Sequence, residues 1–172
     1  STAILLADSA YAVIRSDATQ AYRDVRNQQV TPAVERLVEA TVLLSGLGFE
    51  SGGLSVAHAL IRGLTTLPNV ASRLHGELVA YGTLVQLCWE QQPPECVAEV
   101  LAIIRAVDLP DSLAALGQAA PLTQAERQRV ATATLANSYA ANTAPPLTAE
   151  ALLAAMDEVE RLAGAAPARA VA

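Results

Sequence analysis

The sequence contains no lysine, a single phenylalanine, a single tryptophan and two cysteines in 172 residues. All 11 basic residues are therefore arginine, and 17 acidic residues outweigh them to give a net charge of -6. This charge argues against a nucleic-acid partner, which needs a basic surface. The aromatic share of 3% argues against a β-sandwich, and the hydrophobic content of 52% rules out a disordered chain. We expect a folded domain built from small, helix-forming residues.

Long apolar runs are missing as well. No stretch reaches the roughly 20 consecutive apolar residues of a membrane span, and the N-terminus shows no basic region followed by an apolar core, as in a signal peptide. The two cysteines, Cys88 and Cys96, form no CxxC motif or Cys/His cluster. We therefore predict a cytoplasmic protein without membrane contact, in which Cys88 is a small core residue rather than a nucleophile.

Helix-capping and helix-breaking residues divide the chain into seven to eight predicted helices. Gly46 and Gly48 predict the end of the second helix. Three helix starts are marked by capping residues, namely Thr31 before Pro32, Thr123 with Glu126, and Thr148. The expected helices cover about residues 2–28, 31–45, 54–66, 72–91 and 93–107, a short piece at 112–116, a helix beginning at 123, and residues 149–162.

No run alternates apolar and polar residues for long enough to form a strand, so the predicted fold class is all-α, a bundle of seven to eight helices. We expect one helical domain over residues 1–164 and a flexible tail at 165–172. The Gly46-Leu47-Gly48 stretch follows a helical segment and lacks the spacing of a phosphate-binding loop. The sequence therefore predicts no nucleotide-binding unit within this chain.

His58 and His75 are the only two histidines, and each falls in a predicted helix on a face with apolar residues, so that both rings are expected to point inward. An unsatisfied buried imidazole costs about 1–3 kcal/mol, so each ring needs a hydrogen-bond partner or a metal ion. The two helices are joined by a short turn and are expected to pack antiparallel, which lets the rings converge. From these residues alone, two interpretations stay open: a shared ion, or two separately satisfied core histidines.

Glu77 follows His75 by two residues and lies about 200° around the helix from it. We expect a solvated or capping role for this carboxylate rather than a place in the histidine pair.

The residues around the two histidines form a recognisable set. They comprise SGLGFESGGL at 45–54, Ala57-His58, HGE at 75–77 and VAYG at 79–82. Together they resemble the C-terminal helical domain of the bacterial glycerol dehydrogenase family, within the superfamily of iron-containing alcohol dehydrogenases and dehydroquinate synthase-like proteins. Flanking segments, VTPAVER at 30–36 and GTLVQL at 82–87, extend the resemblance over nearly the whole chain.

The resemblance implies roles for three residues. His58 and His75 match two of the family's three zinc ligands, and Phe49 matches a residue of the substrate pocket, although a core aromatic remains an equal alternative for Phe49. The family's third ligand is an aspartate in a segment expected to lie upstream of Ser1. The family also has a histidine before the asparagine of a later loop, where this sequence has Ala141 before Asn142.

The implied activity is the NAD-dependent oxidation of glycerol to dihydroxyacetone, with zinc making the alcohol acidic. NAD would bind an N-terminal domain that is expected to be absent from this chain, so the implied partners are glycerol or a similar diol and a nucleotide-binding domain or subunit. We expect the chain alone to be inactive, to hold zinc weakly and to form homo-oligomers. The alternative is a non-catalytic helical scaffold or partner subunit derived from this domain, and the sequence is also compatible with a fragment of a longer protein.

Overall fold

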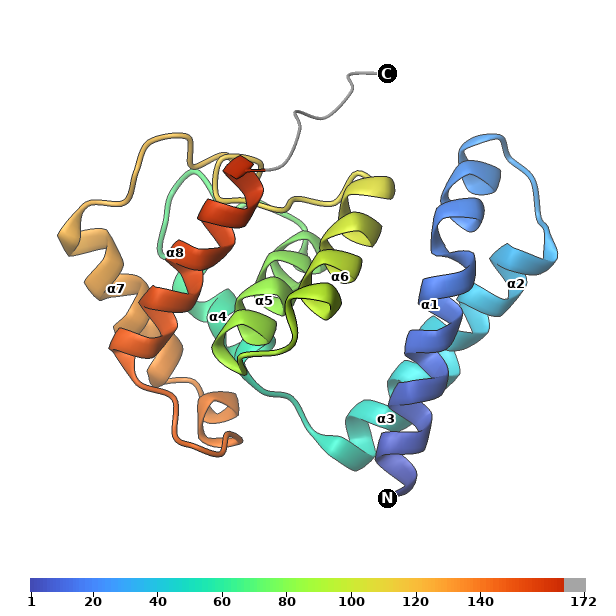
Figure 1. Cartoon of the computed structure of the whole chain (residues 1–172), viewed down its shortest axis with the longest axis horizontal. Helices are drawn as coiled ribbons and strands as arrows, with labels where there is room; N and C mark the ends of the chain where they lie inside the picture. The colour runs from blue at the N-terminus through green and yellow to red at the C-terminus, as the bar shows by residue number, and fades with distance from the viewer. Residues whose placement is uncertain (166–172) are drawn as a thin grey trace. The chain divides into compact units, whose positions relative to one another are not determined.

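The computed structural model describes residues 1–165, and within that range every regular element is helical (Figure 1). This confirms the predicted all-α class. The helices fall into two compact units, residues 1–53 and the part of the chain that begins at Leu54. Residues 166–172, which make up most of the predicted tail, lie outside the described range, while Ala165 is the last residue of a helix.

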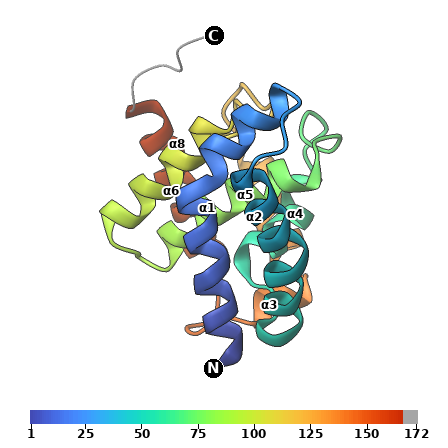
Figure 2. The same ribbon diagram turned by 90° about the vertical axis from the view of Figure 1, so that its right-hand side faces the viewer.

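The first unit is a pair of helical rods joined by a short turn. Helix α1 (Thr2–Arg26) packs along a second rod formed by α2 (Pro32–Glu39), a π-helical turn η1 (Ala40–Leu44) and α3 (Ser45–Gly52), as Figure 2 shows. Small side chains occupy the buried positions between the rods, namely Ala18, Ala21, Ala33 and Ala40. Because these side chains are short, the two rods can approach closely.

The predicted end of the second helix at Gly46 and Gly48 is wrong. The rod continues through both glycines as α3 and ends at Gly52, and Gly53 follows with φ +78°. A glycine inside a helix costs about 1 kcal/mol relative to alanine, which close packing can offset. A Cβ at Gly52 would lie 3.5 Å from the Cβ of Ala3, in ordinary contact with α1. The positive φ of Gly53, rather than glycine content, is what ends the rod.

Two buried carboxylates tie the rods of the first unit together. Asp17 on α1 accepts hydrogen bonds from Nε and Nη2 of Arg36 on α2, at 2.7 and 2.9 Å. This pair lowers the pKa of Asp17 and raises that of Arg36, in both cases chiefly through the side-chain hydrogen bond. Two turns further along α1, Asp24 accepts from the hydroxyl of Thr31, the residue that caps α2. The predicted Thr31–Pro32 helix start is therefore confirmed.

The second unit contains the larger core. Its helices are α4 (Val56–Leu64), α5 (His75–Trp89), α6 (Pro94–Ala106), α7 (Gln124–Leu135) and α8 (Ala149–Ala165), with a 3₁₀ turn η2 (Ser138–Ala141). Helices α4 and α5 pack against each other; α4 also contacts α7, and α5 contacts α6 and α8. Fully buried side chains from these helices form the centre, including Leu60, Leu64, Tyr81, Leu84, Val130 and Leu152.

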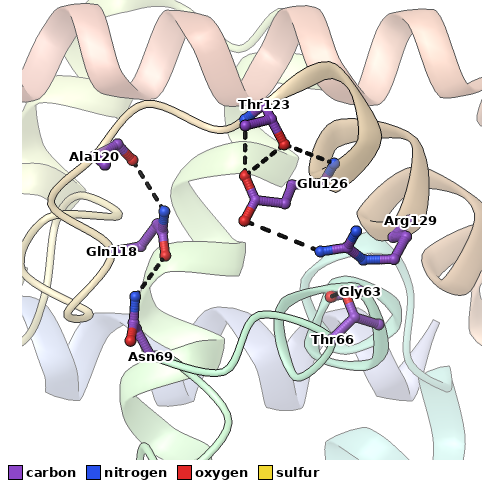
Figure 3. A network of polar contacts seen from close by, with 8 residues as sticks. All are labelled: Gly63, Thr66, Asn69, Gln118, Ala120, Thr123, Glu126 and Arg129. Carbon is purple, nitrogen blue, oxygen red and sulfur yellow. Dashed lines mark hydrogen bonds and ion pairs between the residues drawn. The ribbon is translucent and has the colours of Figure 1, made fainter.

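Capping residues set two helix starts in the second unit as predicted. Thr123 and Glu126 form the expected capping box of α7: the Thr123 hydroxyl accepts from the Glu126 backbone N–H, and the Glu126 carboxylate accepts from the Thr123 backbone N–H at 2.8 Å (Figure 3). Thr148 caps α8 through a 3.1 Å bond from the Ala151 backbone N–H.

One prediction for this unit is wrong and one element was missed. The expected helical piece at residues 112–116 consists of turns, and the 3₁₀ turn at 138–141 was not predicted. Both segments are too short for apolar periodicity to decide between helix and turn.

Within residues 1–165 no single helix is long and apolar enough to cross a membrane. One pair of neighbouring segments, Pro32–Gly52 and Val56–Leu64, reaches the required length and composition only when the two are counted together.

Candidate metal centre

The two histidines lie close together, although they are not buried as predicted. His58 is in the first turn of α4 and is half-buried, whereas His75 is the first residue of α5 and is exposed. The core face of α4 is formed by Val56, Ala59 and Leu60, so His58 lies at the edge of that face. The expectation that both rings point into the core is therefore wrong, because His75 precedes the buried part of α5 rather than lying within it.

The ring centroids of His58 and His75 are 5.5 Å apart, with their planes inclined by 49°. Two imidazoles bound through one nitrogen each to the same tetrahedral zinc ion, at zinc–nitrogen distances of about 2.0–2.1 Å, have ring centres about 5 Å apart. The observed spacing is close to that value, and the tilt leaves the rings free of a stacked arrangement. The separation of the two rings is therefore compatible with a shared ion.

No further acidic, cysteine or histidine side chain completes the pair within the described chain. Residues 1–165 contain no group of three or more His, Cys, Asp or Glu side chains placed to hold a metal ion. Glu77, the nearest carboxylate in sequence to His75, caps the start of α5: its Oε2 accepts from the Leu74 backbone N–H at 2.9 Å. This confirms the predicted capping role of Glu77.

Burial, with a smaller contribution from the neighbouring His75, lowers the pKa of His58 below the ordinary value for histidine. At neutral pH the lowered pKa favours the uncharged imidazole, which is the form that binds a metal ion. The electrostatic setting of His58 therefore agrees with its geometry.

The segment that leads into His75 is held to a neighbouring loop by side-chain hydrogen bonds. Arg73 donates from Nε to the Leu116 carbonyl oxygen at 2.8 Å. Asn69 donates to Oε1 of Gln118 at 3.1 Å, and Gln118 in turn donates to the Ala120 carbonyl, as Figure 3 shows. These bonds hold the segment that ends at Arg73, two residues before His75.

A glycine is required where that loop meets the Asn69 segment. Gly117 has φ +102°, and a Cβ there would lie 2.9 Å from the Asn69 carbonyl oxygen. Any residue with a side chain would be destabilising here, because it would have to adopt the left-handed backbone conformation and its Cβ would approach the Asn69 carbonyl oxygen too closely.

The start of α4 is held by the loop after η2. Asn142 donates from Nδ2 to the Leu54 carbonyl at 2.9 Å, and Ser55 donates from its hydroxyl to the Asn142 carbonyl at 3.3 Å. Sequence reasoning missed this role, because the partners are 87 and 88 positions apart. Asn142 therefore makes polar contacts with the start of α4, although the residue before it is Ala141 where the family has a histidine.

Phe49 lies in α3 of the first unit, and the residue is 42% exposed. The alternative of a core aromatic is therefore wrong. Its predicted place in a substrate pocket stays a prediction.

Cys88 agrees with its predicted role. It packs half-buried against the core of the second unit, and burial raises the pKa of its thiol, which disfavours the reactive thiolate.

Comparison with known proteins identifies relatives of this chain. A glycerol dehydrogenase from Thermotoga maritima is 47% identical over 116 residues, which cover 67% of this chain and 32% of that protein. A hydroxycarboxylate dehydrogenase A from Escherichia coli is 34% identical over 153 residues, covering 86% of this chain and 42% of that protein. No protein-family model matches the sequence.

Solved structures agree with the sequence matches. A probable glycerol dehydrogenase from Sinorhizobium meliloti superposes on 95% of this chain and 46% of its own, with a TM-score of 0.87 and 34% identity. The glycerol dehydrogenase of Schizosaccharomyces pombe gives a TM-score of 0.88 at 33% identity, covering 95% of this chain and 42% of its own.

The fold and the sequence matches together define a helical domain of the dehydroquinate synthase-like class. Within that class, the chain belongs with the C-terminal helical domain of the glycerol dehydrogenases. The matched region covers about a third of the length of these curated glycerol dehydrogenases.

Proposed function

We propose that this chain is the zinc- and alcohol-binding half of an NAD-dependent glycerol dehydrogenase, and that His58 and His75 bind the zinc ion together. The observation that carries the proposal is the 5.5 Å separation of the two imidazole rings. The half-exposed position of the pair supports it further, because a catalytic ion must remain open to substrate on one side.

In this function, each residue of the pair serves as a ligand rather than as a base. A zinc ion, when bound, supplies a Lewis acid that lowers the pKa of an alcohol hydroxyl. His58 offers an imidazole whose lowered pKa favours the uncharged form, and the ring of His75 lies beside it at the start of α5. The partial burial of His58 limits the access of water to one side of the site. By the family resemblance, we assign Phe49 to the wall that contacts the carbon chain of a small diol.

Two components of the reaction would come from outside the described chain. A third ligand, an aspartate, and the NAD-binding domain are both implied by the family resemblance, and the relatives are long enough to hold a further domain. We therefore infer that residues 1–165 by themselves do not oxidise glycerol, because among them we find no counterpart of the family's NAD-binding domain and no third metal-ligating side chain beside the two histidines.

The proposal is tested by returning the chain to a complete enzyme. The segment of the Thermotoga maritima glycerol dehydrogenase that aligns with this chain is replaced by the chain itself, and NADH formation is followed with glycerol and zinc. Glycerol-dependent NADH formation is expected, together with its loss in the same graft carrying His58→Ala. A graft that folds and binds zinc but oxidises no small diol contradicts the proposed function.

A non-catalytic scaffold or partner subunit is the competing function. It differs in one measurable respect, because a scaffold has no need of the histidine pair. Equal zinc binding by the unmodified chain and its His58→Ala variant would favour the scaffold.

Self-association and a cytoplasmic location also stay predictions for this chain. Sedimentation velocity of the purified chain tests the first: a concentration-dependent dimer or larger species is expected, and a monomer throughout the micromolar range contradicts it.

A further inference from the structure

Helix α4 begins without a cap of its own. Ser55 occupies the N-cap position, but its side chain makes no capping hydrogen bond, since its hydroxyl donates to the Asn142 carbonyl instead. The first backbone N–H groups of a helix have no partner within the helix and need one from elsewhere. His58 lies in this uncapped turn, so whatever holds the turn also holds the imidazole.

Gln86 on α5 supplies the missing cap. Its Oε1 accepts from the backbone N–H of Ala57 at 3.0 Å, and its Nε2 donates to Oε1 of Glu90 at 2.7 Å. The backbone N–H can only donate and the carboxylate accepts, so a glutamine amide is suited to bridge the two. Gln92 donates to the other oxygen of Glu90 at 3.1 Å, which fixes the far end of the chain of bonds.

Gly82 holds the other side of the same residue. A Cβ at Gly82 would lie 2.5 Å from the carbonyl oxygen of Ala57 and 3.1 Å from its Cα. The absence of a side chain therefore lets α5 pack directly against the Ala57 backbone. Gly82 and Gln86 are four residues apart and lie on one face of α5. One helix thus contacts both peptide groups of the residue that precedes His58.

His75 lies on that same face of α5. It precedes Gly82 by seven residues and Gln86 by eleven, close to two and three helical turns. A single rigid helix therefore carries one imidazole and, through two contacts on Ala57, sets the position of the other.

We propose that Gln86 and Gly82 are positioning residues for the histidine pair: through the Ala57 backbone they set the separation of His58 from His75. The inference rests on the proposed shared zinc site for its function, but its geometry can be tested without metal. Neither residue contacts the ion, so their effect on it is indirect, in the way that residues behind metal ligands fix ligand orientation.

The test compares the full chain with Gln86→Met, which keeps the length of the side chain and removes both hydrogen bonds. Three quantities are measured: hydrogen exchange of the Ala57 amide, the nuclear Overhauser effect between the two imidazole rings without metal, and zinc affinity by calorimetry. Amide exchange is expected to rise by about 5- to 10-fold. The inter-ring effect is expected to weaken, and zinc affinity to fall by about 10- to 100-fold.

Two further variants separate positioning from general loss of structure. Gln128→Met makes the same substitution at an exposed glutamine of α7 in the same unit, and it is expected to change none of the three quantities. The double variant Gln86→Glu/Glu90→Gln exchanges the two groups: a carboxylate accepts from Ala57, and an amide at position 90 donates to it. We expect this exchange to restore the inter-ring effect and the zinc affinity.

Two results would overturn the inference. The first is faster amide exchange at Ala57 in Gln86→Met with an unchanged inter-ring effect and an unchanged zinc affinity. The second is a double variant Gln86→Glu/Glu90→Gln that restores neither the inter-ring effect nor the zinc affinity. If the unmodified chain binds no zinc, the proposed function loses its support, and the inter-ring effect still decides whether Gln86 positions the pair. If Gln86→Met does not fold, the inter-ring effect and the zinc affinity of the double variant Gln86→Glu/Glu90→Gln decide the inference.

Discussion

The backbone of Gly82 on α5 lies directly against the carbonyl group of Ala57 on α4, so closely that a Cβ at position 82 would approach the Ala57 oxygen to 2.5 Å. Real Cβ atoms essentially never come this near to a backbone oxygen. The two helices that carry His75 and His58 can therefore keep their present separation only while residue 82 has no side chain.

Gly82→Ala is expected to destabilise the chain by about 1–3 kcal/mol, because backbone atoms cannot move aside as a flexible side chain could. The measurement is urea unfolding followed by circular dichroism. Gly76→Ala on the same helix is the matched control, since a Cβ at position 76 meets no atom within 4 Å. Its stability is expected to be unchanged or slightly raised. Equal stability of the two variants would show that the close approach does not constrain the packing.

The Asp17–Arg36 pair predicts a pH dependence in the first unit. The folded-state pKa of Asp17 lies below the ordinary value of 3.8, so its contribution to stability is present above that value and is lost as the pH falls through the folded pKa. Arg36→Met removes the guanidinium that lowers the pKa. Carboxyl titration by nuclear magnetic resonance is expected to give a higher pKa for Asp17 in the variant. An unchanged Asp17 titration would mean that the pair does not persist in solution.

Thr123→Ala removes one half of the capping box at the start of α7. The change is expected to cost about 0.5–2 kcal/mol in unfolding free energy. It should also raise the pKa of Glu126 in part, because it removes the hydrogen bond from the Thr123 hydroxyl, while the backbone N–H of residue 123, the larger cause of the lowered pKa, is kept. Thr132→Ala, in the exposed middle of the same helix, controls for the substitution itself. A variant as stable as the control, with the Glu126 pKa unmoved, would contradict the capping role.

Local signals allowed much of the fold to be predicted from the sequence. The Thr31–Pro32 start and the Thr123–Glu126 box depend on residues three or fewer positions apart, and both were found correctly. The helix end expected at Gly46 was wrong, because packing of the rod against α1 outweighs the weak local preference of glycine. Propensity is a weak guide wherever such packing competes with it.

The candidate site, like the fold, could be predicted from the sequence only in part. His58 and His75 could be selected from sequence, because they are the only histidines and occur within a resemblance to a known family. Gln86 and Asn142 could not, because each acts through a backbone group 29 or 88 positions away. Nothing local distinguishes Gln86 from any other glutamine on a helix, and only the three-dimensional structure shows which peptide group its amide meets.

A calorimetric zinc titration of the chain and of its His58→Ala and His75→Ala variants tests most directly whether the two imidazoles share one ion. The account predicts at most one zinc ion per unmodified chain, and a roughly tenfold or greater loss of affinity, about 1.4 kcal/mol or more, in each single variant alike. Two independent zinc ions per chain, or full affinity after either histidine is replaced, would contradict the shared site.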